Sequence, residues 1–328
     1  MTAGLLVLAA LLFVALWASL MVGAGDVSLT DLLPGITDPD LADKGQLILR
    51  EVRIPRTVSG LLAGVALGLA GTVMQGVARN PLADPGILGV NSGASAAVVF
   101  ALSILGLSDP GRYIWFGFAG ALVASLVVYG IGSMGREGAT PVKLALAGAA
   151  TSAALLSLTT AMLLTDSKSF DQYRFWQVGS LTGRDPAVLW QALPFLVVGT
   201  AFALLLGPRL NALSLGDDLA RGLGQRVGAA RAASALAVVL LCGAATVIVG
   251  PIAFVGLVVP HAARMFTGPD YRWILPYSAL LAPVLLLAAD IVGRVIARPG
   301  EVQAGILTAV IGAVPFVLLV RRRKLAEL

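Results

Sequence analysis

The sequence contains very few of the residues that build metal sites, disulfides and nucleophilic centres. Its 328 residues include one cysteine, Cys242, and one histidine, His261. A disulfide needs two cysteines and a Cys/His metal cluster needs several ligands, so one chain can form neither. Both residues stand in apolar segments, where a buried thiol and a hydrogen-bonded interior imidazole are the simpler interpretation. We therefore expect no metal site and no bound cofactor.

Charged residues are almost as scarce. They make up 12% of the chain, whereas 58% is hydrophobic, and the mean hydropathy is +0.90. A soluble domain needs more polar surface than this composition supplies. The net charge of +5 does not indicate a nucleic-acid partner, because the basic residues are scattered through loops. The chain is predicted to be an integral membrane protein in a lipid bilayer.

The common motifs for energy conversion and hydrolysis are absent from the sequence. There is no G-x-x-x-x-G-K-[ST] run, no H-E-x-x-H, no G-x-S-x-G and no pair of carboxylates within an apolar segment. Without the first motif the chain cannot hydrolyse ATP through a P-loop. The chain is thus predicted not to be an enzyme, and any energy for transport must come from a partner or an ion gradient.

Long apolar runs predict membrane-spanning helices. About 20 residues are needed to cross roughly 30 Å of hydrocarbon. Nine runs approach this length: 4–23, 57–78, 86–106, 113–133, 142–164, 187–207, 232–250, 274–296 and 303–320. The first is interpreted as a retained span, because it carries no basic region and no small-residue cleavage site of a signal peptide.

The positions of basic residues predict a tenth span. Short cytoplasmic loops collect Lys and Arg, so the loop at 208–231 and the cluster at 321–324 should both be cytoplasmic. An even number of crossings must separate two cytoplasmic segments, but the clear apolar runs between these two number three, at 232–250, 274–296 and 303–320. The missing crossing is assigned to 256–266, a short segment entered through Gly250-Pro251 and interrupted again at Pro260. Ten spans place both termini in the cytoplasm.

The loop at 208–231 carries an amphipathic pattern. Its apolar residues are interrupted by Gly216 and Gly224, which predicts two short helices at about 211–230 joined by a turn. The apolar face of such helices needs a partner protein or a lipid surface. An ordinary polar connector is the alternative.

Arginines on the predicted outer side oppose the usual charge bias. Arg53 and Arg56 flank Pro55 before the second span, and Arg294 lies one turn beyond Asp290. The Asp290–Arg294 spacing of i, i+4 favours a helical ion pair. Two interpretations remain open, namely a basic rim that docks an acidic partner or attracts anionic cargo, and arginines that anchor helix ends by reaching towards water.

Small polar residues gather between the second and third predicted spans. The segment at 74–96 contains Pro81 and Pro85, which exclude a continuous helix. Its side chains could line a transport pathway or pack helices against each other. The pathway candidates here are Gln75, Asn91, Ser92 and Ser95.

These segments resemble a known family. RIPRTVSGLLAGVALGLAGTVMQGVARNPLADPGILGVNSGA (residues 53–94), GPIAFVGLVVPHAARMFTGPDYRWILP (250–276) and LLLAADIVGRV (285–295) are similar to FecCD-type permeases of iron-siderophore, haem and vitamin B12 importers. The resemblance covers about residues 4–324. It implies an all-α permease with the fold of type II ABC importers, in which one transmembrane domain occupies 1–328.

The resemblance also implies partners and site residues. The subunit would pair with itself or a homologous permease, bind ATP-binding ABC subunits on the cytoplasmic side, and receive a substrate-binding lipoprotein or periplasmic protein outside. Arg53, Arg56 and Arg294 match arginines that meet the binding protein. A cytoplasmic gate region matches the segment around Thr140. The coupling segment to the ATPase matches Leu215, Gly216, Asp217, Leu219, Ala220, Leu223 and Gly224.

The resulting interpretation is a permease subunit that carries ferric siderophore across a bacterial cytoplasmic membrane. Haem or cobalamin is the alternative cargo. An ion-coupled secondary carrier is a different class, and it usually places ionisable groups near the bilayer midplane. Asp290 is the one deep acid candidate, and its position beside Arg294 argues against that class. A membrane-embedded enzyme is disfavoured by the shortage of His, Cys and paired acids.

Overall fold

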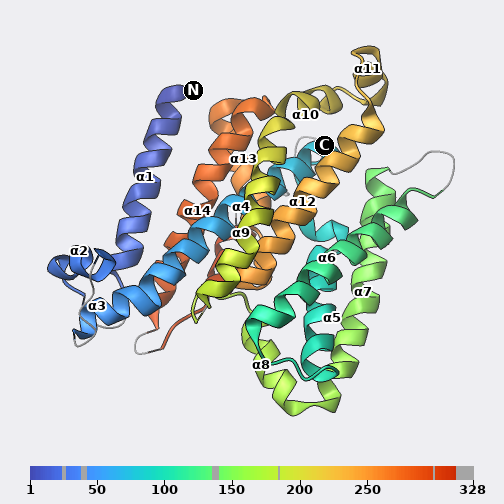
Figure 1. Ribbon diagram of the computed structural model, residues 1–328. Coiled ribbons are helices and arrows are strands. Elements are labelled where there is room, and N and C mark those ends of the chain that lie inside the picture. Colours follow the sequence, from blue (N-terminus) through green and yellow to red (C-terminus); the bar gives the residue numbers. More distant parts are fainter. Residues whose placement is uncertain (24–26, 38–42, 135–139, 184, 298–299, 315–328) are drawn as a thin grey trace.

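The computed structural model describes residues 1–23, 27–37, 43–134, 140–183, 185–297 and 300–314. Within these ranges every regular element is a helix (Figure 1). The principal helices are α1 (Thr2–Met21), α4 (Ile54–Ala78), α5 (Val90–Ser103), α6 (Pro110–Gly132), α7 (Pro141–Thr165), α8 (Ser167–Gln177), α9 (Pro186–Leu205), α10 (Gly207–Ser214), α11 (Asp217–Gly222), α12 (Val227–Val249), α13 (Val255–Thr267) and α14 (Tyr271–Ile296). A further apolar helix covers Ala304–Val314.

Seven of the helices in the described ranges are long and apolar enough to cross a membrane. They are α1, the helical stretch that ends with α4, α6, α7, α9, α12 and α14. Two other predicted spans coincide with shorter apolar helices, namely α5 and Ala304–Val314, and the remaining one coincides with α13, a helix of 13 residues. The prediction of a multi-pass, all-α membrane protein is therefore confirmed, and a count of ten spans is compatible with these helices.

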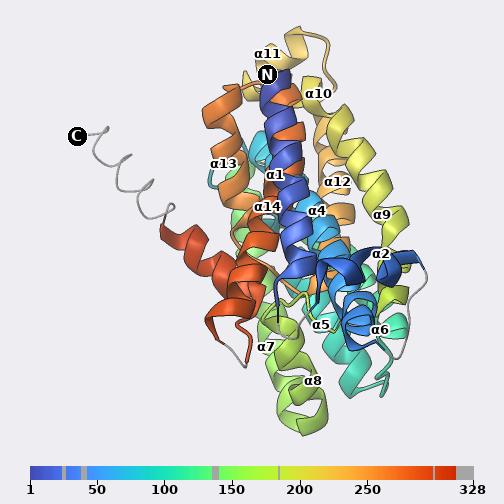
Figure 2. The same ribbon diagram turned by 90° about the vertical axis from the view of Figure 1, so that its left-hand side faces the viewer.

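The helices define two ends of the molecule. The N-terminus, α10 and α11 lie at one end, called the α11 end here (Figure 1). At the opposite end, the α2 end, α2 (Leu29–Thr37) lies across the direction of α1, beyond the last turn of that helix (Figure 2). Helix α3 (Lys44–Ile48) and a π-helical turn (Leu49–Arg53) lead from there into α4. The two ends carry the two groups of predicted functional residues.

Helix α4 forms the centre of the fold. It packs most extensively against α14 and α12 and also contacts α13 and α9. The span that contains α4 is 78% buried, whereas α1 is 6% buried and leaves most of its apolar surface for lipid or a partner. Glycines let the central backbones approach closely, since a Cβ at Gly71 in α4 would overlap the backbone of Gly256 in α13.

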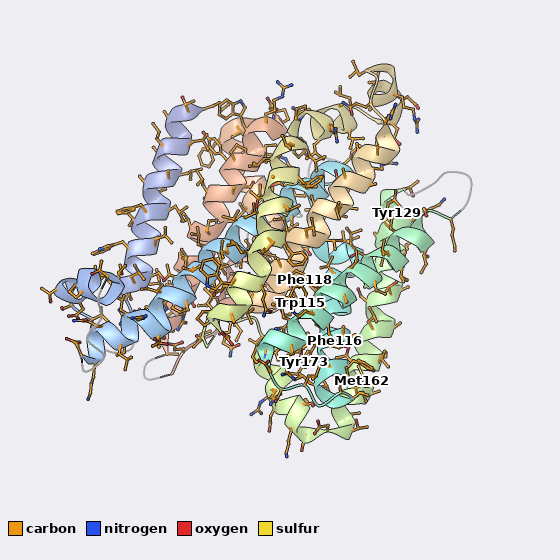
Figure 3. All side chains as sticks on the ribbon, viewed as in Figure 1. Trp115, Phe116, Phe118, Tyr129, Met162 and Tyr173 are labelled. Carbon is orange, nitrogen blue, oxygen red and sulfur yellow. The ribbon has the colours of Figure 1, made fainter. Side chains whose placement is uncertain are left out.

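Aromatic packing holds α6 against α9. The rings of Phe118 and Phe195 stack with centroids 4.3 Å apart, and Trp115 packs edge-on against Phe195 at 6.0 Å. Trp115 and Phe118 lie on the side of the molecule formed by α5 to α8 (Figure 3). Offset and edge-on ring pairs stabilise beyond their buried area.

The short helix α13 differs from the prediction in one respect. It was expected to be interrupted at Pro260, but the helix is continuous from Val255 to Thr267. Proline lacks the amide that would bond the carbonyl four residues earlier, which is that of Gly256. The Gln75 side-chain amide from α4 donates to Gly256 O at 3.3 Å and to Leu257 O at 3.1 Å. The freed carbonyl therefore has a partner, and the helix tolerates the proline.

The backbone between α12 and α13 is irregular, with Gly250 and Ile252 buried and Ala253 exposed. Gly250 and Phe254 have positive φ values of 80° and 68°. At the start of this region, the Val249 carbonyl accepts a hydrogen bond from Ser180 N at 2.8 Å. Non-helical backbone inside a membrane protein needs such internal partners.

Candidate functional site

The three predicted docking arginines come together at the α2 end. Arg53 and Arg56 lie at the start of α4, and Arg294 lies near the end of α14. Their exposed fractions are 2%, 4% and 2%, and Asp290 beside them is fully buried. These residues, with Glu301, are called the arginine network here.

Asp290 is the centre of the arginine network. Its carboxylate accepts hydrogen bonds from Arg56 Nε at 3.0 Å and Arg56 Nη2 at 2.8 Å. It also accepts from Arg294 Nε at 2.9 Å and forms an ion pair with Arg294 Nη2. The helical Asp290–Arg294 pair predicted from the sequence is confirmed. A carboxylate shared by two guanidinium groups is well compensated for its burial.

Two of these arginines also cap the end of α1. Arg294 Nη1 donates to Ser19 O at 2.7 Å and Val22 O at 2.9 Å. Arg53 Nη1 donates to Leu20 O and Met21 O, each at 2.7 Å. The last carbonyls of a helix lack intrahelical donors, so the guanidinium groups satisfy them. The arginine network thus ties α1, which has little buried surface, to α4 and α14.

Glu301 completes the network and was missed by sequence reasoning. Arg56 Nη1 lies 2.8 Å from Glu301 Oε2, and the Thr182 hydroxyl donates to the same oxygen at 3.3 Å. Glu301 is separated from Arg56 by 245 residues, and no spacing rule connects them. Its side chain is 30% exposed, more than that of Arg56 or Asp290.

The three arginines of the predicted basic rim are buried in this structure. The guanidinium groups of Arg53, Arg56 and Arg294 face internal acceptors in this conformation, so they form neither an exposed rim nor a set of side chains that reach into water. Contact with an external carboxylate would need at least one of these bonds to exchange. Docking at these arginines stays a prediction.

The two short helices predicted for 211–230 are confirmed as α10 and α11, although they occupy Gly207–Ser214 and Asp217–Gly222. Gly216 joins them with a φ of 103°, a conformation that other residues rarely adopt, and Gly224 follows α11 with a φ of 80°. Residues 207–224 are called the coupling segment here.

The coupling segment has one exposed apolar face. Leu215, Leu219 and Leu223 are 57%, 62% and 65% exposed, whereas Ala220 is fully buried against the subunit. Asp217 also faces the subunit and forms ion pairs with arginines of α12 and the end of α4. The three leucines form an apolar surface that is suited to a protein groove.

Asn211 connects the coupling segment to α14. Its side-chain amide donates to Asp270 Oδ1 at 2.6 Å, and its carbonyl oxygen accepts from Tyr271 N at 2.8 Å. Asp270 also caps α14 through Arg272 N at 2.9 Å. The hydrogen bond from Asn211, helped by the one from the Arg272 backbone, lowers the pKa of the Asp270 carboxyl below its usual value.

The predicted pathway candidates lie apart and contact other helices. Gln75 is buried and also accepts from Arg264 Nη1 at 2.7 Å. Asn91 accepts from the Thr246 hydroxyl at 2.8 Å, and Ser95 is buried. Thr140 caps the start of α7, and Ser92 in α5 is partly exposed. These contacts pack helices, and a role in the pathway stays a prediction.

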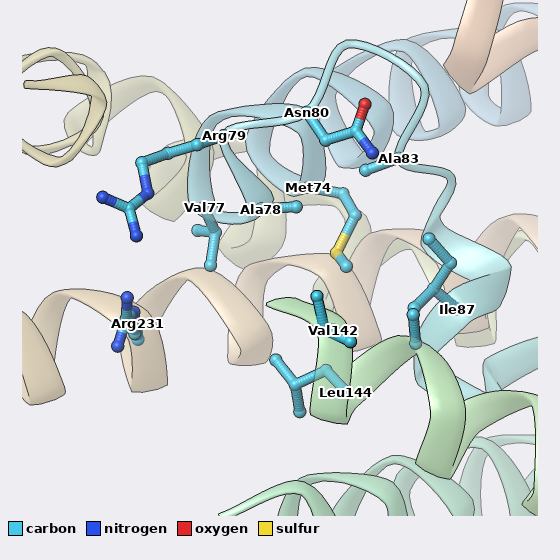
Figure 4. A pocket seen from close by; sticks show the side chains of 11 residues that line it. Met74, Val77, Ala78, Arg79, Asn80, Ala83, Ile87, Val142, Leu144 and Arg231 are labelled. Carbon is cyan, nitrogen blue, oxygen red and sulfur yellow. The ribbon is translucent and has the colours of Figure 1, made fainter. Parts of the chain in front are cut away.

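Two cavities with arginines in their walls lie at the α11 end. One of about 390 Å³ is bounded by Arg79, Arg231 and the residues Val142 and Leu144 of α7 (Figure 4). The second, of about 410 Å³, is lined by residues that include Arg79, His261 and Arg264. Among the residues described, no group of three or more His, Cys, Asp or Glu side chains is placed to hold a metal ion.

Comparison with known proteins agrees with this arrangement. The FecCD transport family matches residues 11–322. The ferric enterobactin transport system permease protein FepD of Escherichia coli (strain K12) is 47% identical over 313 residues, covering 95% of this chain and 93% of that protein. The Fe(3+)-citrate import system permease protein YfmD of Bacillus subtilis (strain 168) is 42% identical over 318 residues, covering 97% and 94%.

A solved structure has the same fold. It is a transporter of the metal-chelate ABC type in an inward-facing conformation, with a TM-score of 0.83 and 27% identity over 97% of this chain and 98% of that one. The chain of PsaBC from Streptococcus pneumoniae, solved with a Fab, has a TM-score of 0.62 at 15% identity and shows the fold alone.

Proposed function

Because the chain belongs to the FecCD transport family, we propose that it is the permease subunit of an ABC importer that carries ferric siderophore across a bacterial cytoplasmic membrane. The observation that carries this proposal is the match along residues 11–322, together with 47% identity to a ferric enterobactin permease over nearly the whole of both chains. The multi-pass helical fold is in accord with it.

The proposed energy source is a separate ATPase. The sequence has no P-loop, so ATP must be hydrolysed elsewhere. The apolar face of Leu215, Leu219 and Leu223 supplies a surface for that partner. In this proposal the α11 end and both termini are cytoplasmic, and residues 1–328 form one permease domain.

The proposed cycle uses both ends of the molecule. A loaded binding protein docks at the α2 end, where the arginine network lies, and two ATPase subunits bind at the α11 end. The pathway forms between this subunit and a second copy or a homologous permease. ATP binding moves the coupling segment, and the pore changes between outward-open and inward-open states. The chelate passes without chemical change.

The proposed cargo is a ferric siderophore, with a catecholate such as ferric enterobactin as the first candidate. This choice follows the relative with 47% identity, which is a ferric enterobactin permease. A relative with 42% identity is an iron-citrate permease, so citrate belongs in the same panel of substrates. Haem and cobalamin remain the alternative cargoes.

Growth assays test the cargo. The chain, expressed with its own binding protein and ATPase subunits, should restore growth on ferric enterobactin to a bacterium that lacks its own siderophore permeases. Uptake of radiolabelled ferric hydroxamates, ferric citrate, haem and cobalamin in the same cells ranks the alternatives. Faster uptake of haem or cobalamin than of every iron chelate would overturn the siderophore assignment.

A further inference from the structure

One carboxylate in the coupling segment contacts two helices of the membrane domain. Asp217 Oδ1 lies 2.9 Å from Arg231 Nη2 and 3.6 Å from Arg79 Nη2. Arg231 belongs to the first turns of α12, and Arg79 follows the last residue of α4. The two partners are 152 residues apart in the sequence, and Asp217 joins them to α11.

The local backbone fixes this junction. Arg79 has a left-handed φ of 49°, and its amide bonds the Gln75 and Gly76 carbonyls, so it ends α4 in a defined direction. Gly216, with its φ of 103°, turns the chain immediately before Asp217. A non-glycine residue with positive φ is uncommon and indicates that its surroundings hold it in place.

The ion pair is partly sheltered from water. The side chains of Asp217 and Arg231 are 25% and 15% exposed. The adjacent Asp218 is fully exposed and pairs at 3.0 Å with Arg221 in its own helix. Exposed pairs contribute little because water screens them, whereas sheltered pairs with good geometry can hold two elements together. The two neighbouring aspartates carry the same group, but Asp217 pairs with Arg79 and Arg231 outside α11, whereas Asp218 pairs within α11.

A cavity separates this junction from α7. Arg79 and Arg231 border the cavity of about 390 Å³, and Val142 and Leu144 of α7 form part of its other wall (Figure 4). Protein interiors are close-packed, so helices that pack against each other move together. Two groups of helices can move relative to each other where a cavity separates them. At this level α4 and α12 form one unit with α11, and the space lies between that unit and α7.

We propose that Asp217 is a positioning residue that transmits displacement of the coupling segment to α4 and α12. The inference rests on the proposed function, because the displacement comes from the ATPase that binds the exposed leucines. Asp217 lies at the start of α11, and the span containing α4 is 78% buried and continues through the core to the arginine network. A displacement of α11 is therefore transmitted to α4 and α12, and α4 extends to the arginine network at the α2 end.

The test compares Asp217→Asn with Asp217→Glu in the complete transporter, reconstituted in proteoliposomes with its ATPase and binding protein. Asn keeps the size of the side chain and removes the charge, whereas Glu keeps the charge. We expect the amount of chelate that Asp217→Asn transports per ATP hydrolysed to fall at least about fivefold, the lower end of measured coupling between sites. Asp217→Glu should recover most of the coupling.

Each other outcome overturns the inference. Wild-type transport per ATP in Asp217→Asn means that the ion pair transmits nothing. Loss of the ATPase subunits from Asp217→Asn during purification means that Asp217 is a docking contact. If Asp217→Glu folds but does not recover coupling, the shape of the side chain and not its charge determines coupling. If the wild-type transporter itself shows no ATP-dependent uptake, the proposed function fails before the Asp217 variants are compared.

Discussion

At the scale of single residues, the arginine network shows what a sequence can and cannot indicate. The Asp290–Arg294 pair follows from helical spacing and is confirmed. The second guanidinium on Asp290 comes from Arg56 in another helix, and the Arg294 bonds to the end of α1 depend on where α1 lies. Such contacts follow from tertiary packing, so neither could be predicted from local pattern.

The buried carboxylate at the centre of the network should be important for stability. Asp290→Asn leaves Arg294 without its charge partner and Arg56 with Glu301 alone, and breaking a buried ion pair in this way costs about 3–5 kcal/mol. The expected result is a markedly lower unfolding temperature of the purified subunit in detergent. Glu301→Gln is the matched control, because Glu301 is 30% exposed and should change the unfolding temperature much less. Equal effects of the two substitutions would contradict the central place of Asp290.

The carboxyl of Asp270 should make stability depend on acidic pH. Its pKa is lowered below the usual 3.8, chiefly by the hydrogen bond from Asn211. A group whose pKa is lower in the folded state stabilises the fold above its unfolded pKa, and that contribution is lost as pH falls through the folded pKa. Stability of the wild type should therefore fall as pH decreases below about 4.

One substitution isolates this contribution. Asp270→Asn should show a shallower loss of stability than the wild type over the same acidic range, because one titrating group has been removed. Unfolding temperatures measured from about pH 6 to pH 3 give both slopes. Parallel curves for wild type and Asp270→Asn would contradict the assignment.

At the scale of elements, apolar runs predicted the helices well because hydrophobic length is a strong local signal. The continuity of α13 through Pro260 could not be predicted, since it depends on a hydrogen bond from Gln75 in α4. Two short helices were predicted from Gly216, Gly224 and the leucine pattern, yet α10 begins at Gly207, several residues earlier than expected. Helix boundaries depend on contacts that the pattern does not contain.

The close approach of α4 and α13 gives a sharp prediction. Gly71→Ala places a methyl group on the backbone of Gly256, which cannot move aside like a flexible side chain. Overpacking of this kind costs about 1–3 kcal/mol or more. Gly130→Ala in α6 is the control, because nothing lies within 4 Å of a Cβ there. Unfolding in detergent should separate the two, and an equally stable Gly71→Ala would contradict the described contact.

The three exposed leucines of the coupling segment give a prediction for the affinity of the ATPase. Leu219→Ser removes one of three exposed apolar side chains without touching the buried Ala220. If the ATPase covers this face, its affinity should fall about tenfold, which corresponds to 1.4 kcal/mol. Leu205→Ser at the end of α9 is the control, since Leu205 is 77% exposed but lies outside the coupling segment. Binding of the purified ATPase to the subunit in nanodiscs measures both, and unchanged affinity for Leu219→Ser would remove this face from the interface.

At the scale of the whole molecule, hydrophobicity alone identified a membrane protein, and the missing P-loop led to the proposal of a separate ATPase. Charge distribution predicted a short additional crossing, and α13 occupies that place. The iron chelate came from family resemblance and is supported by the relatives. The fold was therefore more predictable than the site, whose contacts join residues far apart in sequence.

The central claim is that this subunit transports only as part of an ATP-driven assembly. The most direct measurement is uptake of radiolabelled ferric enterobactin into proteoliposomes that contain the subunit, its ATPase and its binding protein. Uptake should require ATP and both partners, and it should stop when the P-loop lysine of the ATPase is replaced. Uptake by this subunit alone, driven by an ion gradient without ATP, would contradict the account.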